Sequence, residues 1–212
     1  MASRNKSDMT KERILNEAEA LFAMKGFHAV SVREITTAAS CNLAAVNYHF
    51  GNKDSLYLEV FRCRWLPRAK LLQKAFKDNL AGNDSPTPAQ VVEALAQAFL
   101  NGPMSDEERQ RHHMLITKEL SQPTPALKLV VQEAMAPLIS CLMEKLRAGM
   151  PEDCDDQSIC LNILSIFAQV LYFNFARDAV TRITGHTYDD AFKTRLVNHI
   201  TQFSQSALGD GI

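Results

Sequence analysis

The stretch NLAAVNYHFGNKDSL, residues 42–56, suits neither a buried helix nor an ordinary surface helix. A buried helix needs larger apolar side chains than its two central alanines, and an exposed helix usually carries more charge. Asn42 is placed to cap a short helix that ends near His49. Just upstream, the capping-box pattern of Ser31 and Glu34 opens another short helix. Two short helices joined by a tight turn predict a helix-turn-helix, whose second helix enters a major groove.

Helical signals flank this motif on both sides. Apolar residues recur at three- and four-residue spacings from about Thr10 until Gly26, which is placed as a C-terminal cap. Residues 1–9 precede that helix and are predicted to be a flexible tail. Asn52 is placed to cap a long connector helix over residues 53–76.

The rest of the chain also reads as helices, and β-branched alternation is nearly absent. Three further helices open at the cap residues Thr87, Ser105 and Thr124, and two long helices follow over residues 159–180 and 188–208. Pro67 predicts a break or a kink in the connector helix, and Pro137 predicts a kink in the helix that opens at Thr124. We therefore predict an all-α fold of about nine helices, in which a three-helix head is joined by a long connector helix to a C-terminal helical bundle.

Composition places the chain among ordinary globular proteins. Hydrophobic residues make up 46% and charged residues 22% of the 212 residues, and the formal net charge is −1. Residues 1–60 carry seven Lys or Arg and seven Asp or Glu, so DNA contacts must come from locally placed charge. The five cysteines lack CxxC spacing, and we expect no uncharged apolar run long enough to span a bilayer. We expect a cytoplasmic protein with reduced thiols and no membrane association.

The second short helix and the start of the next suit contact with DNA. Ala44 and Ala45 are small enough for the helix to approach base edges, and Tyr48 and His49 place donors near its end. Lys53 lies in the first turn of the following helix, where its charge and the free backbone N–H groups form one anion site.

Two other groups of residues complete the predicted interface. Ser31 and Arg33 are placed to contact phosphates on the other side of the groove. Leu43, Val46 and Phe50 have the spacing of residues that anchor the recognition helix onto the support helix. Each signal is weak alone, and the ordered set carries the prediction.

That ordered set is shared with a known family. Residues 10–60, with ILNEAEALFAMKGF, SVREITTAA and YHFGNKDSLY, resemble the DNA-binding domain of TetR-family transcriptional regulators. The DNA-contacting residues that the resemblance implies are Ser31, Val32, Arg33, Leu43, Ala44, Ala45, Asn47, Tyr48, His49 and Lys53. The last three would bind phosphates. Asn47 replaces an apolar residue of many members, and it either reads a base edge or bonds within the domain.

The resemblance also assigns roles to the rest of the chain. Residues 1–60 are expected to form the DNA-binding domain, and residues 61–212 the ligand-binding and dimerisation domain. The last two predicted helices would pair with their mates in a homodimer, which implies a (pseudo)palindromic operator in double-stranded DNA. The segments YFNFARDAVTRITG and HITQFSQSALG resemble the regulatory domain of CecR-type regulators.

Polar or adaptable side chains within the C-terminal helices are candidates for binding the small-molecule effector. The alternative reading of His113 is a position in a solvated helix start, and that of Met114 is ordinary core. The alternative reading of Gln169 and Tyr172 is that they bridge the dimer. Arg177 is either a helix-end charge or the partner of a ligand carboxylate.

The sequence contains no G-x-S-x-G, Walker or dinucleotide motif, and neither His112 nor His113 has a His or Cys three or four residues away. We therefore expect no catalysis, no cofactor and no metal. We predict a homodimeric DNA-binding regulator, a repressor released by an unidentified small molecule. The alternatives are a DNA-binding dimer gated by a protein partner or by abundance, and more remotely an enzyme with a resembling head.

Overall fold

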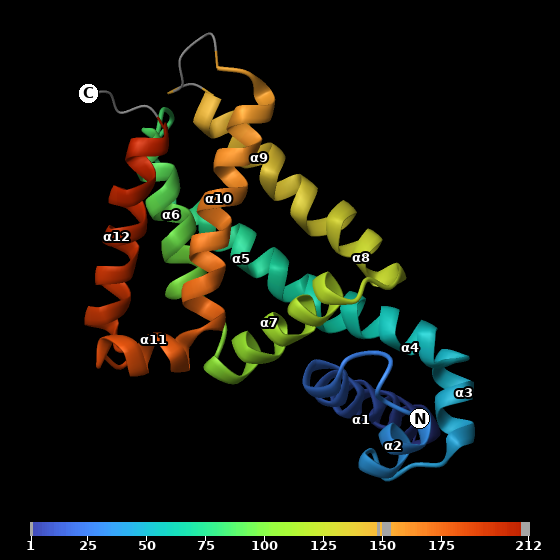
Figure 1. Ribbon diagram of the computed structural model, residues 1–212. Coiled ribbons are helices and arrows are strands. Elements are labelled where there is room, and N and C mark those ends of the chain that lie inside the picture. Colours follow the sequence, from blue (N-terminus) through green and yellow to red (C-terminus); the bar gives the residue numbers. More distant parts are fainter. Residues whose placement is uncertain (1, 148, 150–153, 209–212) are drawn as a thin grey trace. The chain divides into compact units, whose positions relative to one another are not determined.

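The computed structural model describes residues 2–147, 149 and 154–208, and every regular element within them is helical (Figure 1). The helices are α1 (Ala2–Lys25), α2 (Val32–Ala38), α3 (Leu43–Phe50), α4 (Lys53–Val60), α5 (Leu66–Asn79), α6 (Pro88–Leu100), α7 (Asp106–Ser121), α8 (Pro125–Val130), α9 (Ala136–Arg147), α10 (Asp156–Phe175), α11 (Arg177–Thr184) and α12 (Asp190–Leu208). The π-helical turns Phe61–Trp65 and Val131–Met135 join α4 to α5 and α8 to α9. The all-α prediction is confirmed, with ten continuous helices in the described residues rather than nine.

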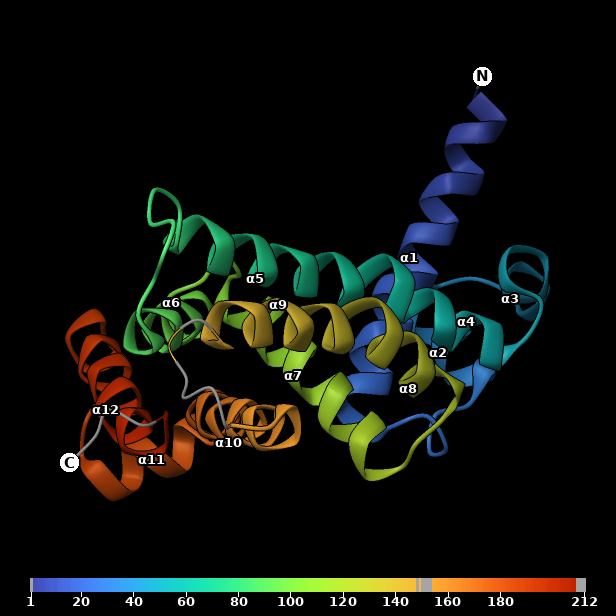
Figure 2. The same ribbon diagram turned by 90° about the horizontal axis from the view of Figure 1, so that it is seen from above.

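The chain divides into two compact units. The first unit comprises Met1–Ala69 and Met104–Glu133, and within it α1 packs against α2, α3, α4 and α7. The second unit comprises Lys70–Pro103 and Ala134–Ile212, and within it α6 lies against α10 and α12 (Figure 2). These units describe packing, and the functional boundary predicted at residue 60 remains a prediction.

The first helix is longer than its sequence pattern predicts. α1 begins at Ala2, so the predicted start near Thr10 is wrong and residues 2–9 are also helical, while the flexibility of residues 1–9 remains a prediction. No Gly or Pro occurs within α1 to interrupt it. The helix ends at the expected place because Gly26 adopts a φ of +82°, which favours glycine.

Local capping explains where most of the helices begin. Eight side chains accept a hydrogen bond from a backbone N–H in the first turn of their helix. Six of them were predicted as caps, namely Ser31, Asn42, Asn52, Thr87, Ser105 and Thr124, and the two that were not predicted are Asp155 and Asp189. In the box expected at Ser31 and Glu34, the Glu34 carboxylate instead binds Lys25. The cap of α2 therefore rests on the Ser31 hydroxyl.

The two prolines inside helices have the same local setting. Pro67 and Pro137 each lie two residues after the end of a π-helical turn. Proline has no N–H to donate and its ring crowds the carbonyl four residues earlier, so a wider turn relieves the clash. Ahead of Pro67 that carbonyl belongs to Cys63, and it accepts a 3.5 Å hydrogen bond from the Arg64 guanidinium.

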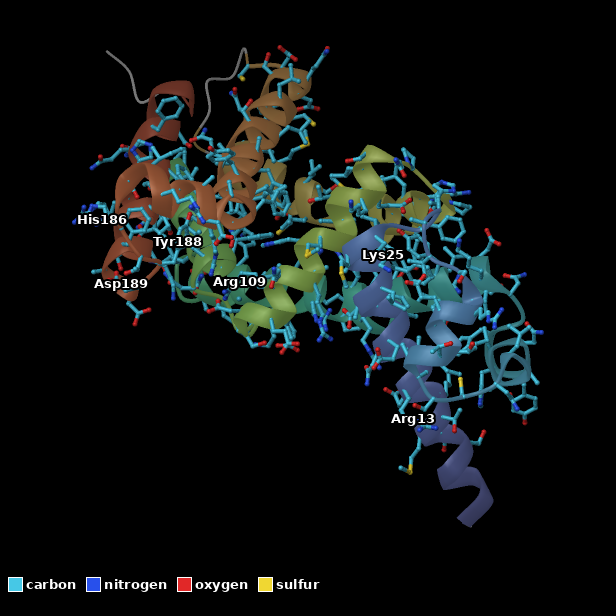
Figure 3. The ribbon with its side chains drawn as sticks, turned by 60° about the horizontal axis from the view of Figure 1, so that its bottom comes forward. Arg13, Lys25, Arg109, His186, Tyr188 and Asp189 are labelled. Carbon is cyan, nitrogen blue, oxygen red and sulfur yellow. The ribbon has the colours of Figure 1, made fainter. Side chains whose placement is uncertain are left out.

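The predicted helix over residues 159–180 is wrong in one respect, because the helix breaks at Ala176. The Tyr188 hydroxyl donates to the Phe173 carbonyl at 2.7 Å and so binds a carbonyl of the last turn of α10. The Arg177 guanidinium lies 4.8 Å from the centroid of the Tyr188 ring. Tyr188 can be located by its label in Figure 3, near His186 and Asp189. These contacts involve residues after the helix, which the apolar pattern of α10 does not reveal.

Candidate nucleic-acid interface

The turn between α2 and α3 fixes how α3 is presented. Ser40 has a φ of +49°, the one positive φ among the described non-glycine residues. The next backbone N–H, that of Cys41, donates to the Thr36 carbonyl at 3.0 Å and closes the turn onto α2. Ile35 of α2 and Val46 of α3 are fully buried, so apolar packing holds the two helices together.

α3 exposes one uncharged face. Leu43 is 53% exposed and Tyr48 81%, and Ala44 and Asn47 are exposed between them. The prediction that Leu43 anchors α3 is wrong, because only Val46 and Phe50 of that trio are buried. Val46 and Phe50 lie one turn apart on the side that faces α1 and α4, whereas Leu43 begins the helix beyond that covered face.

The remaining α3 candidates differ in how accessible they are. Ala45 and His49 are half-buried, and the His49 ring packs edge-on against Tyr48, with 5.0 Å between the ring centroids. No described residue provides a hydrogen-bond partner for the Asn47 side-chain amide. Asn47 was expected either to read a base edge or to form a hydrogen bond within the domain. The described residues provide no partner for the second of these roles.

Lys53 is held at the start of α4. Its ammonium lies 4.4 Å from the centroid of the Phe27 ring, a distance typical of a cation–π contact. Gly51 ends α3 with a φ of +81°, and Asn52 then caps α4 through the Ser55 N–H. This turn places Lys53 beside the free N–H groups of a helix N-terminus, which attract anions.

α2 supplies a second cation. Arg33 is exposed and forms no ion pair with any described residue. It lines an open hollow of about 550 Å³ together with Ser31, Glu34, Thr37 and Ala38. The hydrogen bond from Lys25 lowers the pKa of Glu34, so this carboxylate stays ionised and paired near the hollow. Val32, also a predicted contact, is half-buried.

A buried carboxylate that the sequence analysis missed ties the head to α7. Glu119 is 0% exposed and accepts hydrogen bonds from the Tyr57 hydroxyl at 2.9 Å, the Thr124 N–H at 2.6 Å and the Leu127 N–H at 2.8 Å. Burial first, and then the Glu119 charge, raise the pKa of Tyr57, so its hydroxyl remains a donor. Glu119 therefore joins α4, the helix that follows the helix-turn-helix, to the end of α7 and the start of α8.

A second buried carboxylate lies on α1. Glu19 is almost fully buried, and it pairs with Arg68 of α5 and, at 3.7 Å, with Arg111 of α7. The sequence signal for this site is a glutamate within the apolar spacing of the first helix. Its partners lie far along the chain, so the pattern alone does not identify them.

α7 also contains a buried imidazole. The His112 ring stacks on Trp65 with 4.6 Å between centroids and 6° between planes, and the Trp65 indole N–H donates to the His112 carbonyl at 3.1 Å. Burial, followed by the charges of His113 and Arg68, holds the pKa of His112 well below its usual value. His112 is thus a neutral packing element.

The predicted effector-binding residues fall in both compact units. His113, which is buried, and Met114, which is half-buried, belong to the first unit. Gln169 and Arg177 are half-buried and Tyr172 is exposed, all in the second unit. Neither unit contains all five residues, and their role in binding an effector remains a prediction. Inside the second unit, the apolar space among α6, α9 and α10 is only about 10 Å³.

α10 carries an exposed apolar stripe. The exposed residues recur at helical spacing and are Leu161, Leu164, Ser165, Ala168, Tyr172 and Phe175. The opposite face, with Ile159, Ile163, Ile166 and Val170, is buried in the second unit. An apolar stripe of this kind is the usual mark of a partner surface.

Comparison with known proteins relates both parts of the chain to bacterial regulators. Residues 14–60 match the family described as bacterial regulatory proteins, tetR family. Residues 88–209 match the C-terminal domain of the HTH-type transcriptional dual regulator CecR. These are families of transcriptional regulators, not enzymes.

Individual relatives agree with the family matches. The chain is 27% identical to the HTH-type transcriptional dual regulator CecR of Shigella flexneri over 201 residues, which are 91% of this chain and 88% of that protein. It is 33% identical over 54 residues to the HTH-type transcriptional repressor NicS of Pseudomonas putida, 26% of each protein. The fold is similar to that of a TetR-like transcriptional regulator from Rhodococcus, with a TM-score of 0.67 and 16% identity over 95% of this chain and 97% of that one.

Proposed function

Because this chain belongs to the TetR family of DNA-binding transcriptional regulators, with a C-terminal domain of the CecR type, we propose that it is a repressor released from its operator by a small molecule. Members of the family bind operator DNA and typically act as dimers. The observation that carries the proposal is the uncharged face of α3, flanked by the cations Arg33 and Lys53.

In the proposed complex, α3 lies in the major groove and its neighbours bind the backbone. Lys53 and the N-terminus of α4 bind one phosphate, and Tyr48 and His49 bind the strand beside it. Ser31, Val32 and Arg33 meet the opposite strand. Since the head has no excess of positive charge, these few contacts, doubled in a dimer, supply the electrostatic part of the affinity.

We assign DNA binding to residues 1–60, and ligand binding and dimerisation to residues 61–212. The α10 stripe would pack against α10 and α12 of a second copy, because a two-fold contact buries the same face on both subunits. A two-fold dimer presents two α3 helices to adjacent major-groove turns, so the operator would be (pseudo)palindromic.

The same stripe bears on membrane association. Contrary to the expectation from sequence, Pro125–Arg147 and Asp156–Phe175 are long and apolar enough to cross a membrane by length and composition alone. In each, 28% of the apolar window is buried within the single chain. For α10, pairing with a second copy would cover the exposed apolar face. We place the protein in the cytoplasm, where a DNA-binding regulator meets its operator.

The effector would act by shifting a two-state equilibrium of the dimer. A ligand that binds the C-terminal domain better when the two heads are wrongly spaced would weaken operator binding. A coupling of about 1–3 kcal/mol would change operator affinity roughly 5- to 150-fold. His113, Met114, Gln169, Tyr172 and Arg177 are the residues we would test first for ligand contact.

A second candidate concerns the direction of regulation. The relative from Pseudomonas putida is a repressor, whereas the Shigella flexneri relative, which aligns over most of the chain, is a dual regulator. A regulator that acts in both directions would use the same DNA interface, and the position of each operator would set the sign.

Fluorescence anisotropy of the purified protein on the DNA upstream of its own gene, in a salt series, tests the proposal. We expect binding that far exceeds binding to scrambled DNA and that weakens as salt rises. Absence of binding at low salt, or equal binding to scrambled DNA, would contradict it. The same assay then screens apolar compounds for release of the DNA, and a screen with no releasing compound would favour control by a protein partner or by abundance.

A further inference from the structure

The solvent-facing side of α3 lacks charged side chains, although the proposed function places this helix in the major groove. Its sequence, LAAVNYHF, contains no Lys, Arg, Asp or Glu. The nearby unpaired cation Arg33 belongs to α2, and Lys53 belongs to α4. Guanine is usually read by Arg or Lys and cytosine by Asp or Glu, so α3 offers neither base of a G·C pair its usual partner.

Asn47 is the only side-chain amide on that face. It is exposed, it follows Leu43 by one helical turn, and its amide has no hydrogen-bond partner among the described residues. An asparagine amide matches adenine in the major groove, because it can donate to N7 and accept from the N6 amino group at the same time. An amide left free by the fold is available for that pairing.

The rest of the face at the helix start is hydrocarbon. Leu43, 53% exposed, and the exposed Ala44 occupy the first two positions of α3. In helix-turn-helix proteins the N-terminal residues of the recognition helix contact base edges. The apolar group that bases present in the major groove is the C5-methyl of thymine. Exposed apolar side chains at these positions therefore suit thymine.

On the basis of the proposed function, we propose that α3 reads A·T base pairs. The Asn47 amide bonds adenine through N6 and N7, and Leu43 and Ala44 contact thymine methyl groups. Arg33 and Lys53 set the register of the helix on the phosphates and add affinity without sequence preference. The core of each operator half-site then contains A·T pairs at the positions that α3 reaches.

Selection from duplex DNA with a randomised central segment tests this inference. The wild-type protein should enrich a two-fold motif with A·T pairs in each half-site. Asn47→Ala should fold normally, because the residue is exposed, and should lose the preference at one A·T position per half-site. The discrimination lost there should be about 5- to 150-fold, as for one bidentate contact. Gln110→Ala, which removes an exposed side-chain amide of α7, is the matched control and should leave the motif unchanged.

Base analogues in the selected duplex then identify the atoms involved. The analogue 7-deazaadenine lacks the N7 acceptor of adenine. Its substitution for adenine should weaken DNA binding by the wild type but not by Asn47→Ala, as expected if N7 and Asn47 interact. Thymine replaced by uracil lacks the methyl group and should weaken wild-type binding about fourfold per methyl contact, an effect that Leu43→Ala should reduce.

The outcomes separate this inference from the proposed function. If Asn47→Ala retains every A·T preference, or if the preference it loses is for G·C, the inference is wrong while the regulator proposal stands. If the wild type enriches no motif at all, the proposed function fails and this inference fails with it.

Discussion

The Tyr57 hydroxyl of α4 donates a 2.9 Å hydrogen bond to the buried carboxylate of Glu119 at the end of α7. The same carboxylate accepts the N–H groups of Thr124 and Leu127, the former at the cap of α8 and the latter in its first turn. The Glu119 side chain thus stabilises the start of α8 and fixes the position of α4. The head is therefore held to α7 by a specific polar contact as well as by apolar packing.

We expect Glu119→Ala to be strongly destabilising, because it leaves the buried Tyr57 hydroxyl and the half-buried N–H groups of Thr124 and Leu127 without their acceptor. The loss should be about 3 kcal/mol, or roughly 6–12 °C in melting temperature. Tyr57→Phe removes one of several donors and should cost about 1–2 kcal/mol. Glu133→Ala removes an exposed carboxylate and is the matched control. Thermal unfolding followed by circular dichroism measures all three, and equal melting temperatures for Glu119→Ala and Glu133→Ala would refute the role of Glu119.

Lys53 is expected to bind a DNA phosphate through the ammonium that now lies over Phe27. Lys53→Ala should lower the slope of log affinity against log salt by about 0.9 per phosphate contact, hence about 1.8 for a dimer. Affinity should fall for all DNA sequences alike. The measurement is the anisotropy salt series. The control is Lys77→Ala, which changes an exposed lysine of α5. A slope that does not change in Lys53→Ala would show that this lysine makes no phosphate contact.

Features that depend on neighbouring residues were predictable from the sequence. The helix-turn-helix follows from Ser31 and Asn42, whose side chains cap the two helices that they precede. Gly26 likewise marks the end of α1 because few other residues adopt its φ. In each case a residue acts within four residues of its own position, so the pattern is visible in one short segment.

Features that depend on distant residues were not predictable. Glu19 and Arg68 are 49 positions apart, and Tyr57 and Glu119 are 62 apart, so no local spacing links them. The exposure of Leu43 has the same origin, because spacing gives the face of a helix but not how far its neighbours extend to cover it. At the break near Ala176, the last turn of α10 accepts a hydrogen bond from Tyr188, which lies beyond α11.

His112 should make stability depend on pH. Because burial lowers its pKa in the folded protein, the unfolded chain takes up a proton near the ordinary value of 6.5 while the folded chain does not. Stability should therefore fall as pH falls, by about 1.4 kcal/mol at one unit below that value. Urea unfolding followed by the fluorescence of Trp65, the single tryptophan, measures this. His112→Phe keeps an aromatic ring beside Trp65, and an undiminished pH dependence in that variant would assign the effect elsewhere.

The α10 stripe should hold two copies of the chain together. Leu164 is 42% exposed at its centre, and Leu164→Glu would bury a charge in the expected dimer contact. We expect light scattering after gel filtration to give the monomer mass of 23.7 kDa for this variant and twice that mass for the wild type. Leu71→Glu, which alters a leucine of α5 that is 46% exposed, should remain dimeric. If Leu164→Glu remains a dimer of unchanged stability, the two-fold contact lies on another face, and the (pseudo)palindromic spacing must be set there.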